Sequence, residues 1–119
     1  DEDKSEYDSI LEDFFKKHNT IKNCITFCSK AHIVGDFILR TNRKNIQIMG
    51  YDMVEKNAEC LRKGSISFLI AQHAFMQGYY CVDTLFKAIV LHEKVPPVNY
   101  MPIELLSREN VDFYRRTQL

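Results

Sequence analysis

The sequence predicts an α/β fold in which alternating helices and strands build a mostly parallel sheet. Apolar residues recur at helical spacing in some segments and form short continuous runs in the segments between them, and this alternation extends along the 119 residues. The connections between segments are short, which favours parallel strands joined by right-handed crossovers. A chain of this length has the size of one domain.

The first predicted elements are a helix, a strand and a second helix. The first helix spans about 5–18, because its apolar residues recur at helical spacing and form one stripe: Tyr7, Ile10, Leu11, Phe14 and Phe15. A short buried strand is predicted over 24–28. Ser29 is a good N-cap for a second helix that ends at Arg40.

The alternation continues with a strand over 45–49, which Gly50 closes. Asp52 is expected to be the N-cap of a third helix that ends at residue 63. Gly64 then stops this helix in the left-handed conformation that is typical of helix ends. A third strand over 66–71 follows.

The last predicted elements are a long helix and a short strand. The helix covers about 74–92 and carries one apolar stripe: Val82, Leu85, Phe86, Ile89 and Val90. Two consecutive prolines at 96 and 97 break the chain, and a strand over 102–106 closes the predicted fold.

Polar residues directly after the strands are the candidate ligand contacts. In parallel α/β sheets, ligands bind beyond the carboxyl ends of the strands. Ser29, Asp52 and Gln72 each lie just past a predicted strand. A carboxylate accepts hydrogen bonds and a Gln amide both donates and accepts them, so Asp52 and Gln72 suit a ligand that carries hydroxyl groups. Helix capping is the alternative explanation for Asp52, and a polar strand exit is the alternative for Gln72.

The composition argues against several other functions. Sixteen basic side chains balance sixteen acidic ones, so this segment lacks the net field that attracts nucleic acid. The longest apolar runs are too short to cross a membrane. The four glycines are isolated from one another, which argues against a phosphate-binding loop. The chain contains no nucleophile motif, and we expect no catalytic residue and no enzyme activity.

The histidines and cysteines are scattered along the chain, so we expect no metal site and no cofactor. Cys24 and Cys28 fall within one predicted strand and on one face of it. They are about 13 Å apart along that strand, which is too far for a disulfide. Unpaired cysteines favour reduced thiols and a cytoplasmic location.

A receiver domain of a two-component system is one alternative, because it also places an aspartate at a strand end in such a sheet. Receiver domains need an acidic pair after the first strand. The first clear strand here is followed by Ser29, Lys30 and Ala31, which disfavours this class.

The stretch over 46–78 is more specific than any of its single residues. One strand ends in Gly50-Tyr51-Asp52, Asn57 lies in the following helix, and that helix ends at Lys63-Gly64. The next strand ends in Gln72, and Gly78-Tyr79 follows. This pattern resembles LacI-type bacterial transcription regulators and the related periplasmic sugar-binding proteins. The segment over 102–110 resembles the closing strand of this family, and the match upstream of residue 46 is topological.

The resemblance implies half of a bilobed, periplasmic-binding-type (type I) effector domain, so residues 1–119 are expected to be a partial domain. They would supply elements of the C-terminal lobe, whereas the helix over 74–92 would belong with the other lobe. Asp52 and Gln72 match ligand contacts of the family, and Ser29 matches a position where sugar binders often have Asn. The implied function is sensing of a sugar-like effector by a LacI-type regulator, whose DNA-binding headpiece lies outside this chain.

Two other functions stay open. One is a sugar-binding protein of an uptake transporter, and the other is a sugar-processing enzyme on the same sheet. The cysteine usage and the lack of a secretory signal at Asp1 favour the regulator. Because the apolar stripe of the helix over 74–92 would lack its partner lobe, we also expect this segment to self-associate as a dimer or larger, and to bind its effector poorly.

Overall fold

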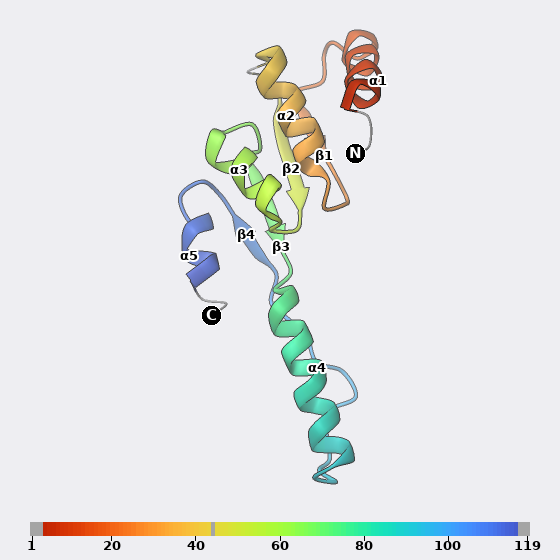
Figure 1. Ribbon diagram of the computed structural model, residues 1–119, viewed down its shortest axis with the longest axis vertical. Helices are drawn as coiled ribbons and strands as arrows, with labels where there is room; N and C mark the ends of the chain where they lie inside the picture. The colour runs from red at the N-terminus through yellow and green to blue at the C-terminus, as the bar shows by residue number, and fades with distance from the viewer. Residues whose placement is uncertain (1–3, 44, 117–119) are drawn as a thin grey trace.

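The computed structural model describes residues 4–43 and 45–116, and helices alternate with strands as predicted (Figure 1). The elements in chain order are α1 (Lys4–Lys17), β1 (Asn23–Ile25), α2 (Ala31–Thr41), β2 (Gln47–Tyr51), α3 (Glu55–Lys63), β3 (Phe68–Ala71), α4 (Ala74–Ile89), β4 (Glu104–Leu106) and α5 (Val111–Arg116). The predicted mostly parallel α/β class is confirmed.

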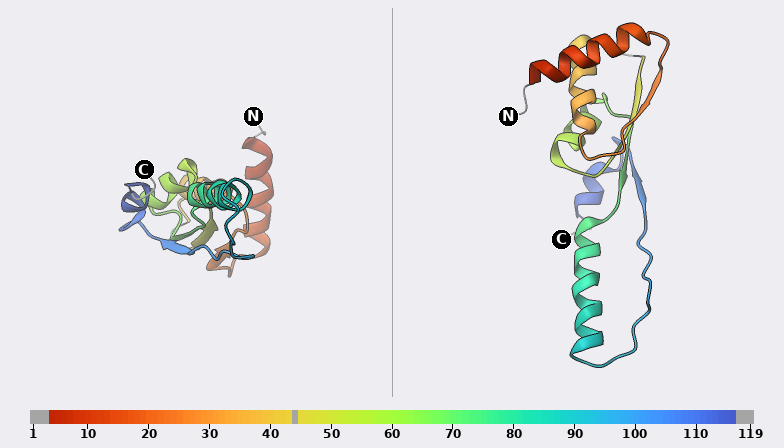
Figure 2. Two further views of the ribbon diagram at one scale, coloured as in Figure 1. Left: turned by 90° about the horizontal axis from the view of Figure 1, so that it is seen from below. Right: turned by 90° about the vertical axis from the view of Figure 1, so that its right-hand side faces the viewer.

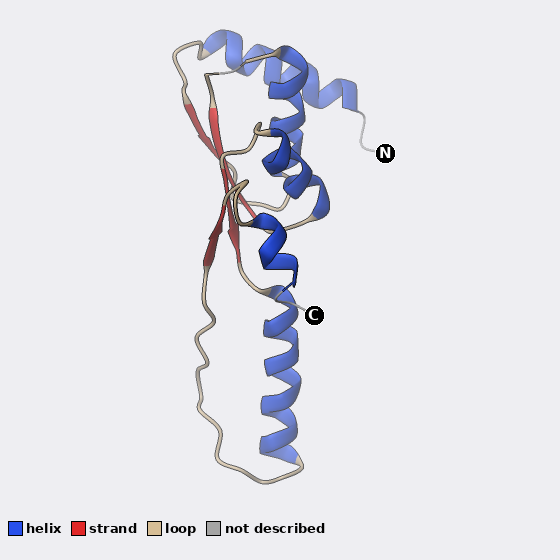
Figure 3. Ribbon diagram, turned by 90° about the vertical axis from the view of Figure 1, so that its left-hand side faces the viewer, coloured by secondary structure: helices blue, strands red, loops and turns tan. Residues whose placement is uncertain are grey.

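The strands form one sheet in the order β1-β2-β3-β4. β1 and β2 pair in parallel, and so do β2 and β3, whereas β4 pairs antiparallel to β3. The antiparallel strand has a simple geometric reason. The chain leaves the carboxyl end of β3 into α4 and returns to the same end of the sheet, so β4 must run in the opposite direction (Figure 3).

The core lies between the sheet and the helices on one side of it, which include α2 and α3 (Figure 3). Its largest fully buried apolar side chains are Ile48, Leu61, Ile66, Leu69, Leu106 and Val111. The opposite face of the sheet is also apolar, but Ile25, Phe68 and Leu105 stay exposed there. One face of the sheet is therefore packed, and the other is left partly open by the described residues.

Both predicted N-caps are wrong. α2 has Lys30 at its N-cap and α3 has Val54, and neither helix has a side-chain cap bond. α3 begins only at Glu55, because Asp52 adopts a left-handed backbone with φ of 68°. By contrast, Gly64 ends α3 with φ of 83° as predicted, and its amide donates to the last turn.

Some predicted strand limits also need correction. β1 ends at Ile25, so the exposed Cys28 lies outside the strand and does not share a strand face with Cys24. Gly50 lies inside β2 instead of closing it, and the start of α2 packs so closely over this position that a Cβ would clash. The short helix α5 was not predicted. It follows a turn in which the Asn110 side chain accepts from the Ser107 amide and donates to the Leu105 carbonyl.

Helix α4 leaves the core and extends away from it, and the segment over 91–103 runs back alongside (Figures 1 and 2). The described chain is consequently elongated, measuring 59 × 28 × 27 Å. None of the residues of α4 is buried, and the predicted apolar stripe is exposed, with Val82 at 69% and Ile89 at 66%. Within residues 4–43 and 45–116, none of the helices has the length and apolar character needed to cross a membrane.

The packing at Gly50 gives a direct test of the fold. A Cβ added there would clash with the Ala31 side chain, whereas one added at Gly78 on α4 would meet nothing within 4 Å. We expect Gly50→Ala to lower the free energy of unfolding by about 1–3 kcal/mol through overpacking. The matched Gly78→Ala should raise it by up to about 1 kcal/mol through helix propensity. Urea denaturation measures both, and equal stability of the two variants would contradict the packing.

Candidate functional site

Asp52 and Gln72 meet at the carboxyl edge of the sheet. β2 and β3 are parallel neighbours, so the residues that follow them emerge side by side. The Nε2 atom of Gln72 donates to Oδ1 of Asp52 at 3.0 Å, and the Asp52 amide donates to the Ile70 carbonyl at 2.9 Å. Asp52 is half-buried and Gln72 is exposed, so both side chains can reach a ligand.

The buried side chain of Asn57 organises this edge from below. Its Nδ2 atom lies within hydrogen-bond distance of three carbonyls, those of Ser29 (3.0 Å), Tyr51 (3.1 Å) and Asp52 (3.0 Å), which share its two hydrogens. Its Oδ1 atom accepts from the His32 amide at 2.8 Å. One amide on α3 therefore fixes the loop after β1, the end of β2 and the first turn of α2.

The same network fixes the imidazole of His32. The Nδ1 atom of His32 lies 3.0 Å from Oδ1 of Asn57. Because an amide oxygen only accepts hydrogen bonds, Nδ1 must carry a hydrogen. The Asn57 orientation is itself set by its carbonyl partners, so this tautomer follows from the network and not from the ring alone.

Ser29 enters the network through its main chain. Its carbonyl shares the Asn57 amide with the Asp52 carbonyl, which brings the loop after β1 close to the end of β2. The three predicted contact residues are thus gathered at one edge: Asp52 and Gln72 by a direct hydrogen bond, and Ser29 through Asn57. The sequence pattern contained Asn57, but its role as a common partner depends on the fold.

Both strands are followed by a non-glycine residue in the left-handed region. Asp52 has φ of 68° after β2, and His73 has φ of 53° near the end of β3. Asp tolerates this region better than most residues do, and such strained positions concentrate at functional sites. The left-handed backbone also explains why Asp52 does not cap α3: its side chain instead accepts a hydrogen bond from Gln72.

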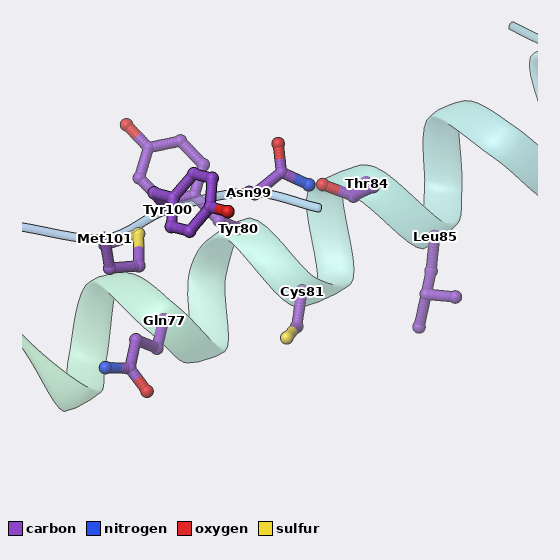
Figure 4. Close-up of a pocket in the computed structure, with 8 residues that line it drawn as sticks. All are labelled: Gln77, Tyr80, Cys81, Thr84, Leu85, Asn99, Tyr100 and Met101. Atoms are coloured by element: carbon purple, nitrogen blue, oxygen red, sulfur yellow. The ribbon is translucent and has the colours of Figure 1, made fainter. Parts of the chain in front are cut away.

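Two hollows of the described surface lie beside α4. One of about 610 Å³ lies between α4 and the returning segment, and its eight lining residues are drawn in Figure 4. A second of about 420 Å³ adjoins it nearer the sheet and includes His73 and Met76. Ser29, Asp52 and Gln72 line neither of these two hollows.

Cysteines and metal ligands add no second site to this edge. The four cysteines are free thiols, and burial raises the pKa of Cys60 to about 11, which keeps it neutral at neutral pH. In the part of the chain that the structure describes, no group of three potential metal ligands gathers. The expectation of a metal-free protein stays a prediction.

A mostly parallel sheet with polar residues at its carboxyl edge, and with a helix that leaves the core, is the architecture of half of a periplasmic-binding-protein-like domain. The family model for the periplasmic binding protein domain matches residues 1–94. The chain therefore belongs to the periplasmic binding protein domain family. A search among curated proteins finds no match.

Solved structures resemble the chain over nearly its whole length. A Bacteroides fragilis protein, proposed to be a LacI transcriptional regulator, is 40% identical with a TM-score of 0.87 over 90% of this chain and 37% of its own. The sugar-binding protein of a Bacillus halodurans sugar ABC transporter is 23% identical, with a TM-score of 0.76 over 94% of this chain and 42% of its own. A carbohydrate transporter solute-binding protein from Agrobacterium radiobacter, in complex with D-arabinose, is 22% identical, with a TM-score of 0.80 over 95% and 39%.

These matches differ in what they establish. The two transporter proteins are similar at the level of the fold, since their identity to this chain is below 25%. The chain spans less than half the length of each of the three proteins. The proteins are described as a regulator and as sugar-binding proteins, and none of the three as an enzyme.

The hydrogen bonds of Asn57 predict that replacing this one side chain destabilises the fold strongly. Asn57→Ala should lower the free energy of unfolding by about 2–4 kcal/mol, because buried carbonyls lose their donor. Asn57→Asp, which has the same shape, should cost at least as much, since a carboxylate cannot donate to these carbonyls. Asn99→Ala, at an exposed position, is the control and should stay within about 0.5 kcal/mol of the parent chain. Chemical denaturation that finds Asn57→Asp as stable as the parent would contradict the network.

Proposed function

We propose that this chain is part of the effector-sensing domain of a LacI-type transcription regulator, and that the effector is a sugar-like small molecule. The observation that carries this proposal is the 40% identity to the Bacteroides fragilis protein over 90% of the chain. The sugar-binding transporter proteins from Bacillus halodurans and Agrobacterium radiobacter reach 23% and 22%. Sequence identities this low support only the shared fold, so the proposed role follows the more similar Bacteroides fragilis protein.

The proposed ligand contacts are Asp52, Gln72 and Ser29. Oδ1 of Asp52 already accepts from Gln72, which leaves Oδ2 of Asp52 and Oε1 of Gln72 to accept from hydroxyl groups of a ligand. Ser29 lies on the adjoining loop and would contribute its hydroxyl. Related proteins were solved with α-D-tagatopyranose and D-arabinose, which supports a monosaccharide as the class of ligand.

We propose that the complete effector domain has a second lobe, which residues 1–119 lack. Gln72 is exposed and Asp52 is partly exposed at this edge, and a second lobe would close over them. Helix α4 carries an exposed apolar stripe, and the open face of the sheet exposes Ile25, Phe68 and Leu105. The similar regulator and transporter structures are more than twice as long as the portion that this chain matches. Additional chain is thus present in those proteins, and an equivalent part here would cover these surfaces.

The charge and the cysteines of this chain bear on its partners and its location. The balanced charge of this chain gives it no field for nucleic acid, so DNA would be bound through a separate headpiece. The free cysteines favour a reducing, cytoplasmic location. The role is that of a binding domain and not of an enzyme.

A sugar-binding protein of an uptake transporter is the second candidate, and the transporter structures with TM-scores of 0.76 and 0.80 favour it. The two roles differ in DNA binding. Gel-shift titration of the full-length protein with its own upstream DNA, with and without candidate sugars, separates them. A sugar-dependent shift supports the regulator, and the absence of any DNA binding supports the transporter protein.

The ligand site predicts the effect of removing its polar groups. In the full-length protein, Asp52→Ala and Gln72→Ala should each weaken effector affinity by about ten- to a hundredfold, because a hydrogen bond to a charged or well-placed polar group is lost. Isothermal titration calorimetry measures the affinity, and circular dichroism checks the fold. Asp13→Ala on α1 is the matched control. Unchanged affinity in both site variants would remove Asp52 and Gln72 from the ligand site.

The exposed stripe of α4 predicts self-association of the 119-residue chain. Burying such side chains is worth about 1.5–3 kcal/mol each, so two copies gain by covering them. Light scattering at micromolar concentration should report a dimer or larger. Replacing Val82 and Ile89, at 69% and 66% exposure, by Lys should shift the chain toward the monomer. A parent chain that stays monomeric and binds a sugar with micromolar affinity would contradict both the self-association and the need for a second lobe.

A further inference from the structure

Two chain segments connect the αβ core to the projecting helix, and together they form a narrow neck (Figure 1). The chain leaves the core after Ala71, through Gln72 and His73, and enters α4 at Ala74. It returns to the core at Glu104, which is paired with Ala71 in the β3–β4 ladder. The direction of α4 relative to the sheet is thus decided by a few residues on these two segments.

His73 contacts both sides of this neck and a third element. Its Nε2 atom lies 3.1 Å from Oε2 of Glu104 on the returning strand. Its backbone amide donates to the hydroxyl of Tyr114 on α5 at 3.1 Å, and the two rings lie 4.9 Å apart. Because a carboxylate only accepts hydrogen bonds, Nε2 must carry a hydrogen in this contact.

The contacts of His73 lie in a largely buried environment. The His73 side chain is only 15% exposed, and Tyr114 is 5% exposed within the core cluster. The backbone of His73 is left-handed with φ of 53°, a conformation that non-glycine residues adopt infrequently and that surrounding contacts help to hold. Side chains that lie 31 and 41 positions further along the chain supply that support.

We propose that His73 is a positioning residue that clamps the neck: held by Glu104 and Tyr114, it fixes the direction in which the chain enters α4. The adjoining residue, Gln72, is held on both sides. Its side-chain amide donates to the Asp52 carboxylate, and its backbone carbonyl accepts from Nε2 of Gln77 at 2.6 Å. The clamp thereby couples the orientation of α4 to the position of the Gln72 amide. The consequence for ligand binding rests on the proposed function, whereas the clamp itself does not.

Amide hydrogen exchange of the 119-residue chain, followed by mass spectrometry, tests the clamp without any ligand. The variants are Glu104→Gln, His73→Asn and their combination. Asn tolerates the left-handed backbone, so His73→Asn removes the ring and keeps the conformation. Tyr114→Phe removes only the hydroxyl that accepts from the His73 amide. Glu59→Gln, which removes the exposed ion pair with Lys63 on α3, is the matched control.

Peptides that cover 72–77 and 102–106 should exchange about two- to fivefold faster in Glu104→Gln, because the carboxylate that accepts from Nε2 of His73 is replaced by a weaker, neutral acceptor. The exchange rate of the peptide over 47–51 should stay the same in Glu104→Gln. In the control Glu59→Gln, the exchange rates of the neck peptides should also stay the same. The double variant should match His73→Asn alone, because both substitutions remove one interaction. Tyr114→Phe should accelerate exchange at 72–77 by about tenfold.

Three results would overturn the clamp. One is equal exchange of the neck peptides in Glu104→Gln and Glu59→Gln. The second is multiplication of the two single effects in the double variant, which would show that Glu104 and His73 act independently. The third is faster exchange of the 47–51 peptide by the same factor as the neck, which would mean a general loss of stability. Since no sugar is present, none of these results depends on whether the ligand site is correct.

Discussion

The arrangement of the carboxyl edge depends on one buried amide. A polar side chain removed from water is stable only if its hydrogen bonds are satisfied, and leaving such groups unpaired costs about 1–3 kcal/mol each. Asn57 is fully buried and meets this condition with partners from three segments. Those segments are then held together, because moving any of them away weakens its hydrogen bond to Asn57. The edge is organised before any ligand arrives.

The other features of the site follow from this constraint and from the parallel sheet. Asp52 is held at both of its backbone groups: its carbonyl bonds to Asn57, and its amide bonds to the Ile70 carbonyl of β3. Between these two bonds, its backbone adopts the left-handed conformation. Its carboxylate then points to Gln72 instead of to the start of α3. A close approach of α2 to Gly50 adds to the arrangement, since a Cβ at this position would clash with Ala31 at the start of α2. A preorganised edge of this kind is consistent with one half of a two-part site.

Local patterns in the sequence predicted the features that depend on local forces. The helical spacing of apolar residues predicted the helices, and Gly64 predicted the end of α3. Both features depend on residues that are close in the sequence. The N-caps at Ser29 and Asp52 were wrong for the opposite reason: their backbone is set by Asn57, which lies on another element. The antiparallel direction of β4 and the short helix α5 could also not be predicted, because they depend on the path that the chain takes around α4. Asp52 and Gln72 could be placed at one edge from strand order alone, whereas Asn57 and His73 gain their roles from contacts across many positions of the chain.

The central claim is that a ligand binds at the edge that Asn57 organises. A crystal structure of the full-length protein with its effector bound tests it most directly. We expect ligand hydroxyl groups within hydrogen-bond distance of the Asp52 carboxylate and the Gln72 side-chain amide, with Asn57 still bonded to the carbonyls of Ser29, Tyr51 and Asp52. An effector bound away from this edge, or an Asn57 side chain that has left these carbonyls, would contradict it.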